Sequence, residues 1–209
     1  MRWPERLLLV ALLCCARVAI ANDAYDELYR LYDYPQELNR EQVPVCSQHG
    51  CERVTRVALS AAQWQQVGRH LAQPAASAAA EREQIREAIA EMERVAGLLA
   101  GTSGDRGGDL AGLTTLSAQM DCVDEASNTT TYLTLFEQAG LLHWHQVEPR
   151  VMRGYFIVGG WPHFTALLRE RQSGDLWVVD SWFRDNGQPP DVVELATWKA
   201  GWKPEGFVF

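Results

Sequence analysis

The sequence predicts an α+β fold, because two hydrophobic periods divide the chain into a helical part and a strand part. Before Gly140 the longest apolar patterns recur every three to four residues, as on one face of a helix. Beyond Gly140 apolar and polar residues alternate, as they do in half-buried strands. The polar turn Ser173-Gly174-Asp175 separates two of these alternating segments and predicts an antiparallel hairpin.

Composition indicates one globular domain. The 209 residues are 47% hydrophobic and 22% charged, which is enough for a single sizeable core. The net charge of −8 argues against a nucleic-acid partner, because the chain offers no basic stripe to neutralise phosphates.

The N-terminus has the pattern of an export signal. Two arginines precede the apolar run Leu7–Ala16, and Ala19-Ile20-Ala21 forms a small-x-small cleavage site. The alternative is an uncleaved anchor, although the run is short for a membrane span. We therefore expect residues 1–21 to be a signal peptide that is removed near Ala21. Residues 22–209 would then form one periplasmic or secreted domain without a membrane span.

The cysteines that remain after cleavage carry a second prediction. Cys46 and Cys51 lie five positions apart, so we expect them to pair as a disulfide in an oxidising compartment. A loop this small braces the chain mainly locally. Cys122 is then the odd cysteine, and an odd cysteine in an exported protein is a candidate reactive thiol.

Residues 22–117 are predicted to be mainly helical. Ser60 and Gln63 resemble a capping box, and Gly101 follows the clearest helical pattern as a stop signal. That pattern places Ile85, Ile89, Met92, Ala96 and Leu99 on one face. In order, the predicted elements are a short helix near Tyr25–Leu31, a strand over Glu52–Leu59, a helix over Ala61–Leu71 and a helix over Ser77–Leu99. Residues 101–112 contain five glycines and are either a flexible surface loop or a mobile flap beside the thiol.

Residues 118–209 are the predicted catalytic-type core. A helix is expected over Cys122–Gln138, with a polar run at 127–131 and Asp121 as its N-cap. Cys122 then lies in the first turn, where unpaired N–H groups and the helix dipole favour a thiolate. The other predicted elements are strands over His143–Glu148, Arg153–Val158, His163–Arg169 and Leu176–Ser181, and a short helix over Glu194–Lys199.

Three residues follow one another in the order of a thiol nucleophile, its base and the group that orients the base: Cys122, His163 and Asp180. A free thiol titrates near pH ~8.5, so we expect His163 to be an imidazolium paired with a thiolate, held by Asp180. The strand register decides whether His163 and Asp180 share a sheet face. The Cys122 N–H and the Gln119 side chain are candidate oxyanion donors. The plain alternatives are an inert buried thiol, a backbone-bonded histidine and an ion-paired acid.

The same residues resemble those of the bacterial transglutaminase-like cysteine peptidases, within the papain-like superfamily. The resemblance covers Asp121-Cys122-x-Asp124, Gly140-Leu141-Leu142, His163 and Val179-Asp180. It implies that the cysteine helix packs on an antiparallel sheet carrying the histidine and the aspartate. It also implies a protein or peptide substrate, and calcium bound by Asp121 and Asp124. The alternative for these two acids is a solvated helix start.

The sequence leaves other functions open. On the same fold, the protein could be a non-catalytic periplasmic binding module, or the thiol could transfer an acyl group to an amine. Four tryptophans are candidates to line a groove, with Trp182 nearest the site: Trp144, Trp161, Trp177 and Trp182. A zinc site is a third alternative, built from His143, His145, Cys46, His49 and Cys51. No cofactor is required by the predicted thiol chemistry.

Overall fold

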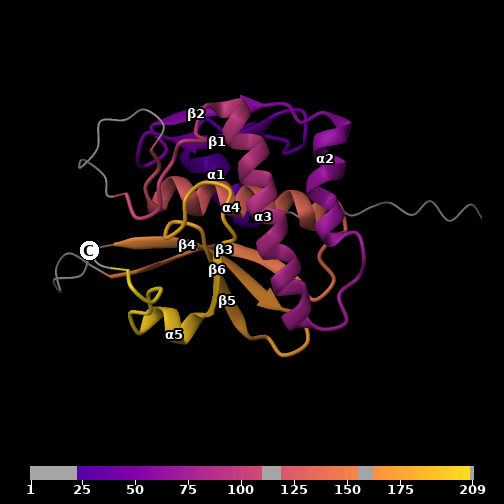
Figure 1. Cartoon of the computed structure of the whole chain (residues 1–209), viewed down its shortest axis with the longest axis vertical. Helices are drawn as coiled ribbons and strands as arrows, with labels where there is room; N and C mark the ends of the chain where they lie inside the picture. The colour runs from indigo at the N-terminus through magenta and orange to yellow at the C-terminus, as the bar shows by residue number, and fades with distance from the viewer. Residues whose placement is uncertain (1–22, 110–118, 155–161, 208–209) are drawn as a thin grey trace, which may run out of the picture.

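A computed structural model of the chain describes residues 23–109, 119–154 and 162–207, and it has an α+β fold (Figure 1). The helices are α1 (Asp23–Leu31), α2 (Ala61–Gly68), the 3₁₀ helix η1 (Arg69–Leu71), α3 (Ala78–Ala100), α4 (Cys122–Gln138) and α5 (Leu195–Lys199). The strands are β1 (Val43–Ser47), β2 (Arg53–Val57), β3 (His145–Arg153), β4 (His163–Glu170), β5 (Leu176–Asp180) and β6 (Asp191–Glu194). Strands β1 and β2 pair with each other, and β3-β4-β5-β6 form a four-stranded antiparallel sheet.

Helix α4 is the centre of the molecule. Figure 1 shows it running between the β1–β2 pair and the four-stranded sheet, and it contacts β1, β3, β4 and β5. Its polar run is buried, so each hydroxyl needs an internal partner. Ser127 and Thr131 donate to carbonyls four residues earlier in the helix, and Thr129 bonds Ser181, whereas Thr130 Oγ1 has no partner among the described residues. Asn128 reaches β1 instead, where its amide bonds both the N–H and the carbonyl of Cys46. The polar run thus fixes the disulfide strand to α4.

The capping signals predicted the helix boundaries well. Ser60 and Gln63 form a capping box at α2, and Gly101 ends α3 with a left-handed φ of 82°. Asp121 caps α4 through the N–H groups of Val123 and Asp124. The predicted hairpin is also present, with Gly174 at a φ of 80° between β4 and β5.

The strand predictions were less accurate. The structure adds β1 and β6, which the sequence did not indicate, so residues 22–117 hold a two-stranded sheet as well as helices. The strand predicted over His143–Glu148 continues as the single strand β3 to Arg153, with a register shift between Glu148 and Val151. Pro149 lies at this shift because it has no N–H to give to the ladder. Of the strand predicted over Arg153–Val158, the last four residues lie outside the described part of the chain.

Among the described residues, no helix is both long and apolar enough to cross a bilayer. The predicted signal peptide, residues 1–21, lies outside the described residues.

Candidate active site around Cys122

Cys122 is the first residue of α4, as predicted, and its thiol is free. The residue is 8% exposed, and its Sγ donates to the carbonyl oxygen of Pro162 at 3.8 Å. Pro162 immediately precedes His163, so the thiol lies beside the start of β4. This contact brings the predicted nucleophile to the strand that carries the predicted base.

His163 and Asp180 share a sheet face and are hydrogen bonded. The β4–β5 register pairs Ala166 with Val179. Continuing it places Thr165 opposite Asp180, and His163 is two residues further along the same face. His163 Nε2 lies 2.8 Å from Asp180 Oδ2, and both residues are buried. Among the described residues, Nδ1 of His163 has no hydrogen-bond partner, so one ring nitrogen remains for chemistry.

Aromatic side chains enclose the imidazole. The ring centroids of Trp182, Phe183 and Trp198 lie 4.8, 5.4 and 5.5 Å from that of His163. Trp182 and Phe183 also pack against Cys122 in one apolar cluster. Trp182 therefore lies at the site, as predicted. Trp144 and Trp177 do not join this cluster, and Trp161 lies outside the described residues.

Burial of the thiol works against the predicted thiolate, and the thiolate–imidazolium pair stays a prediction. Burial raises the pKa of Cys122 to about 12, a hydrogen bond from the Phe164 backbone opposes this shift, and the charges of Asp121 and Asp180 add to it. The hydrogen bond to Pro162 also requires the proton on sulfur. The effect of the helix start is therefore smaller than the combined effect of burial and the two neighbouring charges.

The predicted disulfide between Cys46 and Cys51 is present. Its loop makes a left-handed turn, with φ between 60° and 70° at Gln48, His49, Gly50 and Cys51. Left-handed backbone costs roughly 1–2 kcal/mol at each non-glycine residue. Such a turn needs compensating contacts, and its N–H groups provide them.

Those N–H groups bind the acids that flank Cys122. The N–H groups of His49 and Cys51 donate to Asp124 at 2.8 and 2.7 Å, and that of Gly50 donates to Asp121 at 3.0 Å. Each of the four carboxylate oxygens thus accepts at least one backbone N–H. These carboxylates are thus already engaged by backbone donors of the helix start and the disulfide loop, and calcium binding by Asp121 and Asp124 stays a prediction of the family resemblance. The acids cap the helix and anchor the disulfide loop.

The glycine-rich segment packs closely against the site. At Gly107 a Cβ atom would lie 2.6 Å from the Phe183 backbone, and at Gly108 it would lie 2.7 Å from the Phe207 ring. The described part of this segment, up to residue 109, is thus a strap that packs at Gly107 and Gly108 against residues beside the site, while the flexible loop and the mobile flap both stay predictions. Gln119 fastens it, because its amide accepts from the Arg106 N–H and donates to the Gly104 carbonyl. The predicted oxyanion role of Gln119 stays a prediction, and its amide is already engaged with the strap.

A group of buried acids adjoins the helix start. Burial raises the pKa values of Glu93, Asp105 and Asp124 to about 7, and it raises that of Glu125 well above its ordinary value. Mutual repulsion adds to the effect at Asp105, Asp124 and Glu125. Burial therefore opposes the charged form of these acids near Cys122.

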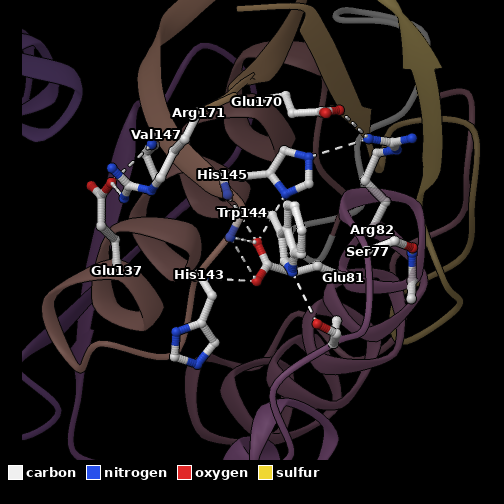
Figure 2. A network of polar contacts seen from close by, with 12 residues as sticks. Ser77, Glu81, Arg82, Glu137, His143, Trp144, His145, Val147, Glu170 and Arg171 are labelled. Atoms are coloured by element: carbon white, nitrogen blue, oxygen red, sulfur yellow. Dashed lines mark hydrogen bonds and ion pairs between the residues drawn. The ribbon is translucent and has the colours of Figure 1, made fainter. Parts of the chain in front are cut away.

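The zinc alternative is not assembled, because the disulfide uses both cysteine sulfurs. Figure 2 shows where the histidines of that alternative lie. His145 Nδ1 bonds Glu81 at 2.9 Å and its Nε2 lies 3.3 Å from Arg82 Nη1, while His143 gives only its backbone N–H to Glu81. Neither ring nitrogen of His145 is free for a metal.

One residue of the site was missed by sequence reasoning. Trp198, on α5, is fully buried and donates its indole N–H to Asp180 Oδ2 at 2.8 Å. A buried tryptophan needs a partner for its N–H, but nothing in the sequence links this one to Asp180.

Comparisons with models of known families, with curated proteins and with solved structures gave no match. The papain-like resemblance therefore rests on the order of the motifs in the sequence.

Proposed function

We propose that the protein is an exported, transglutaminase-like thiol hydrolase that acts on amide bonds of a protein or peptide through an acyl-enzyme. One observation carries the proposal. His163 is bonded to Asp180 through Nε2, its Nδ1 has no described partner, and the thiol of Cys122 lies against the carbonyl of the preceding residue. A nucleophile, a base with one free nitrogen and an orienting carboxylate thus converge from α4, β4 and β5.

The first half of the reaction forms a thioester. Cys122 Sγ attacks the substrate carbonyl carbon while its proton passes to His163 Nδ1. The imidazolium is stabilised by Asp180 Oδ2, which accepts from Nε2. Asp121 binds the N–H groups of Val123 and Asp124, which leaves the Cys122 N–H to donate to the oxyanion. The C–N bond then breaks, and His163 returns the proton to the leaving amine.

The second half regenerates the thiol. Water attacks the thioester carbon, His163 takes a proton from it, and the C–S bond breaks to release the acid and the protonated thiol. An amine in place of water would give acyl transfer by the same steps. Burial, which raises the pKa of the Cys122 thiol, favours proton transfer in concert with attack over a standing ion pair.

The test is acylation of the full chain by p-nitrophenyl acetate, followed by intact mass and assigned by peptide mapping. We expect one acetyl group on Cys122, no adduct there in Cys122→Ser, and a rate lower by roughly 10²–10⁴-fold in His163→Gln. Glutamine keeps a donor near the Nε2 position, so the bond to Asp180 can persist without the base. His145→Asn is the matched control and should acylate at the wild-type rate. Equal rates in His163→Gln and wild type would contradict the proposal, as would the absence of an adduct.

A non-catalytic binding module is the second candidate, and the high thiol pKa favours it. A thiol whose pKa is raised to about 12 is unreactive unless a base takes its proton. In that case Cys122→Ala would keep the stability and the partner binding of the wild type, and acylation would be slow in all variants.

The proposed export is supported by two independent features. The sequence predicts a signal peptide, and the structure contains the Cys46–Cys51 disulfide, which is typical of oxidising compartments. N-terminal sequencing of the protein isolated from the producing cell tests it. A mature chain starting near Asn22 is the expected result, and an intact Met1 would contradict it.

A further inference from the structure

We infer that Trp198 is a positioning residue for the candidate site, holding the Asp180 carboxylate in the orientation that His163 needs. The inference rests on the proposed function. Trp198 is fully buried, and its Nε1–H donates to Asp180 Oδ2 at 2.8 Å. The same oxygen accepts from His163 Nε2 at 2.8 Å. Both described bonds of the carboxylate thus converge on one atom.

The other carboxylate oxygen makes the tryptophan bond important. Asp180 Oδ1 is buried and has no hydrogen-bond partner among the described residues. Only the donors on Oδ2 therefore define the rotation of the carboxylate. With the indole bond removed, the bond from His163 Nε2 would be the one described hydrogen bond left on this carboxylate, and one bond does not define the rotation of the group. The indole N–H of Trp198 therefore holds the Asp180 carboxylate in one rotation.

The indole is itself held in place from two sides. Its ring centroid lies 5.5 Å from that of His163, so one side chain contacts both the base and the acid. The Arg153 guanidinium lies 4.4 Å from the ring centroid, and its Nη1 donates to the Trp198 carbonyl. Burial lowers the pKa of Arg153, and the charge of Asp180 opposes this shift. The short helix α5 thus delivers a rigid donor to the site.

If Trp198 only packed in the core, its aromatic ring would be sufficient and its N–H would not matter. Phenylalanine keeps an aromatic ring but lacks the N–H, so Trp198→Phe separates the two roles. Trp177 offers a matched control, because it lies on the neighbouring β5 and its buried Nε1 has no partner among the described residues. Trp177→Phe removes a similar amount of ring without removing a hydrogen bond.

The experiment measures the acylation rate of Cys122 and the imidazole N–H proton resonance of His163 in the full chain. For Trp198→Phe we expect the rate to fall about tenfold or more, the scale of one hydrogen bond to a charged group, and the resonance to shift. Trp177→Phe should keep the acylation rate within about twofold of wild type and leave the His163 resonance unshifted. A Trp198→Phe variant that is less stable but keeps the wild-type rate and resonance would show a purely structural tryptophan.

A second measurement covers the case in which Trp198→Phe does not fold. The indole N–H resonance of Trp198 should differ between the wild type and the Asp180→Asn variant, because the acceptor of this N–H changes. An unmoved resonance would overturn the inference. If the wild type forms no acyl adduct, the proposed function fails, whereas these resonances still report whether Trp198 and Asp180 are bonded.

Discussion

Two buried histidine–carboxylate pairs occupy different parts of this molecule and do different things. His163–Asp180 joins β4 to β5, and His145–Glu81 joins β3 to α3 (Figure 2). Their bond lengths are similar, 2.8 and 2.9 Å, and all four side chains are at least nine-tenths buried. Bond length and burial therefore do not distinguish the pair of the candidate site from the other buried pair.

The two pairs differ in how many of their polar atoms have hydrogen-bond partners. Glu81 also accepts the backbone N–H groups of residues 143–145, and His145 Nε2 faces Arg82, which pairs with Glu170. Burial alone would raise the pKa of Glu81, but these hydrogen bonds lower it. His163 keeps Nδ1 without a described partner and has a thiol beside its strand. An unused nitrogen next to a nucleophile is what marks a candidate catalytic histidine.

The largest expected effect comes from removing the charge of the orienting acid. Asp180→Asn should slow acylation of Cys122 by roughly 10²–10⁴-fold, because the neutral amide neither stabilises the imidazolium nor enforces its tautomer. The shape of the site is kept, so we expect only a modest change in the unfolding midpoint. Acylation by p-nitrophenyl acetate and thermal unfolding measure the two quantities. A rate within a few-fold of wild type would assign Asp180 to structure instead.

The matched change in the other pair should have the opposite profile. Glu81→Gln leaves an amide N–H where the carboxylate accepted backbone donors, and a broken buried pair costs about 3–5 kcal/mol. We expect the free energy of unfolding to fall by about this amount while the folded fraction acylates at the wild-type rate. Urea denaturation, with acylation measured well below the midpoint, tests this. A loss of acylation without a loss of stability would remove the distinction between the two pairs.

The fold was predictable where capping residues mark the ends of helices. It was less predictable where burial on both faces removes the alternation of polar and apolar residues in a strand. Ser60, Asp121 and Gly101 mark helix ends through contacts within a few residues, so the sequence reveals them. Strand β1 is buried at all five positions, so it lacks the period-two alternation that identifies a strand. Pro44 within it also favours a break over a strand. Its position is decided by Asn128, far away in sequence.

The site shows the same division. The sequence predicted the bond between His163 and Asp180, since hairpin partners are local features, and Cys122 at the helix start contacts Pro162, the residue before His163. Sequence could not reveal that Asp124 would be bound by the disulfide loop, because backbone N–H donors leave no side-chain signature. Sequence could not reveal the burial of the Cys122 thiol either, because burial depends on packing from distant segments, such as the one that carries Trp182.

The disulfide loop tests whether the two pairs are independent. Its N–H groups bind Asp121 and Asp124 beside the thiol, and they do not touch the Glu81 network. The double variant Cys46→Ala/Cys51→Ala should lose about 2 kcal/mol of unfolding free energy from loop entropy. It should also acylate several-fold more slowly, because the acids lose their donors. Reduction of the wild type by dithiothreitol is the parallel measurement. Slower acylation with an unchanged unfolding free energy would contradict the bracing role.

The smallest effect should come from a third pair, His49–Asp109, which is only partly buried. Burial would lower the pKa of His49, but the bond to Asp109 and the charges of Asp121 and Asp124 outweigh it and raise the pKa. A raised value means that the folded protein binds this proton more tightly. The resulting stability is complete below the unfolded value of about 6.5 and is lost as pH rises through the folded value.

His49→Gln isolates that contribution, because glutamine keeps a neutral donor near the Nε2 position and cannot titrate. With the His49 side chain 19% exposed, we expect a loss of about 0.5–1 kcal/mol at pH ~5.5 and almost none at pH ~8.5. Urea denaturation at both pH values gives the difference in unfolding free energy between wild type and variant. The buried acids are present in both proteins, so the effect of their titration cancels in this difference. A difference that does not change with pH would mean that the His49–Asp109 contact is a neutral hydrogen bond. The three histidine–carboxylate pairs, at His145, His163 and His49, would then differ in how their ring nitrogens are hydrogen bonded. A charge on His49 would make no contribution to stability.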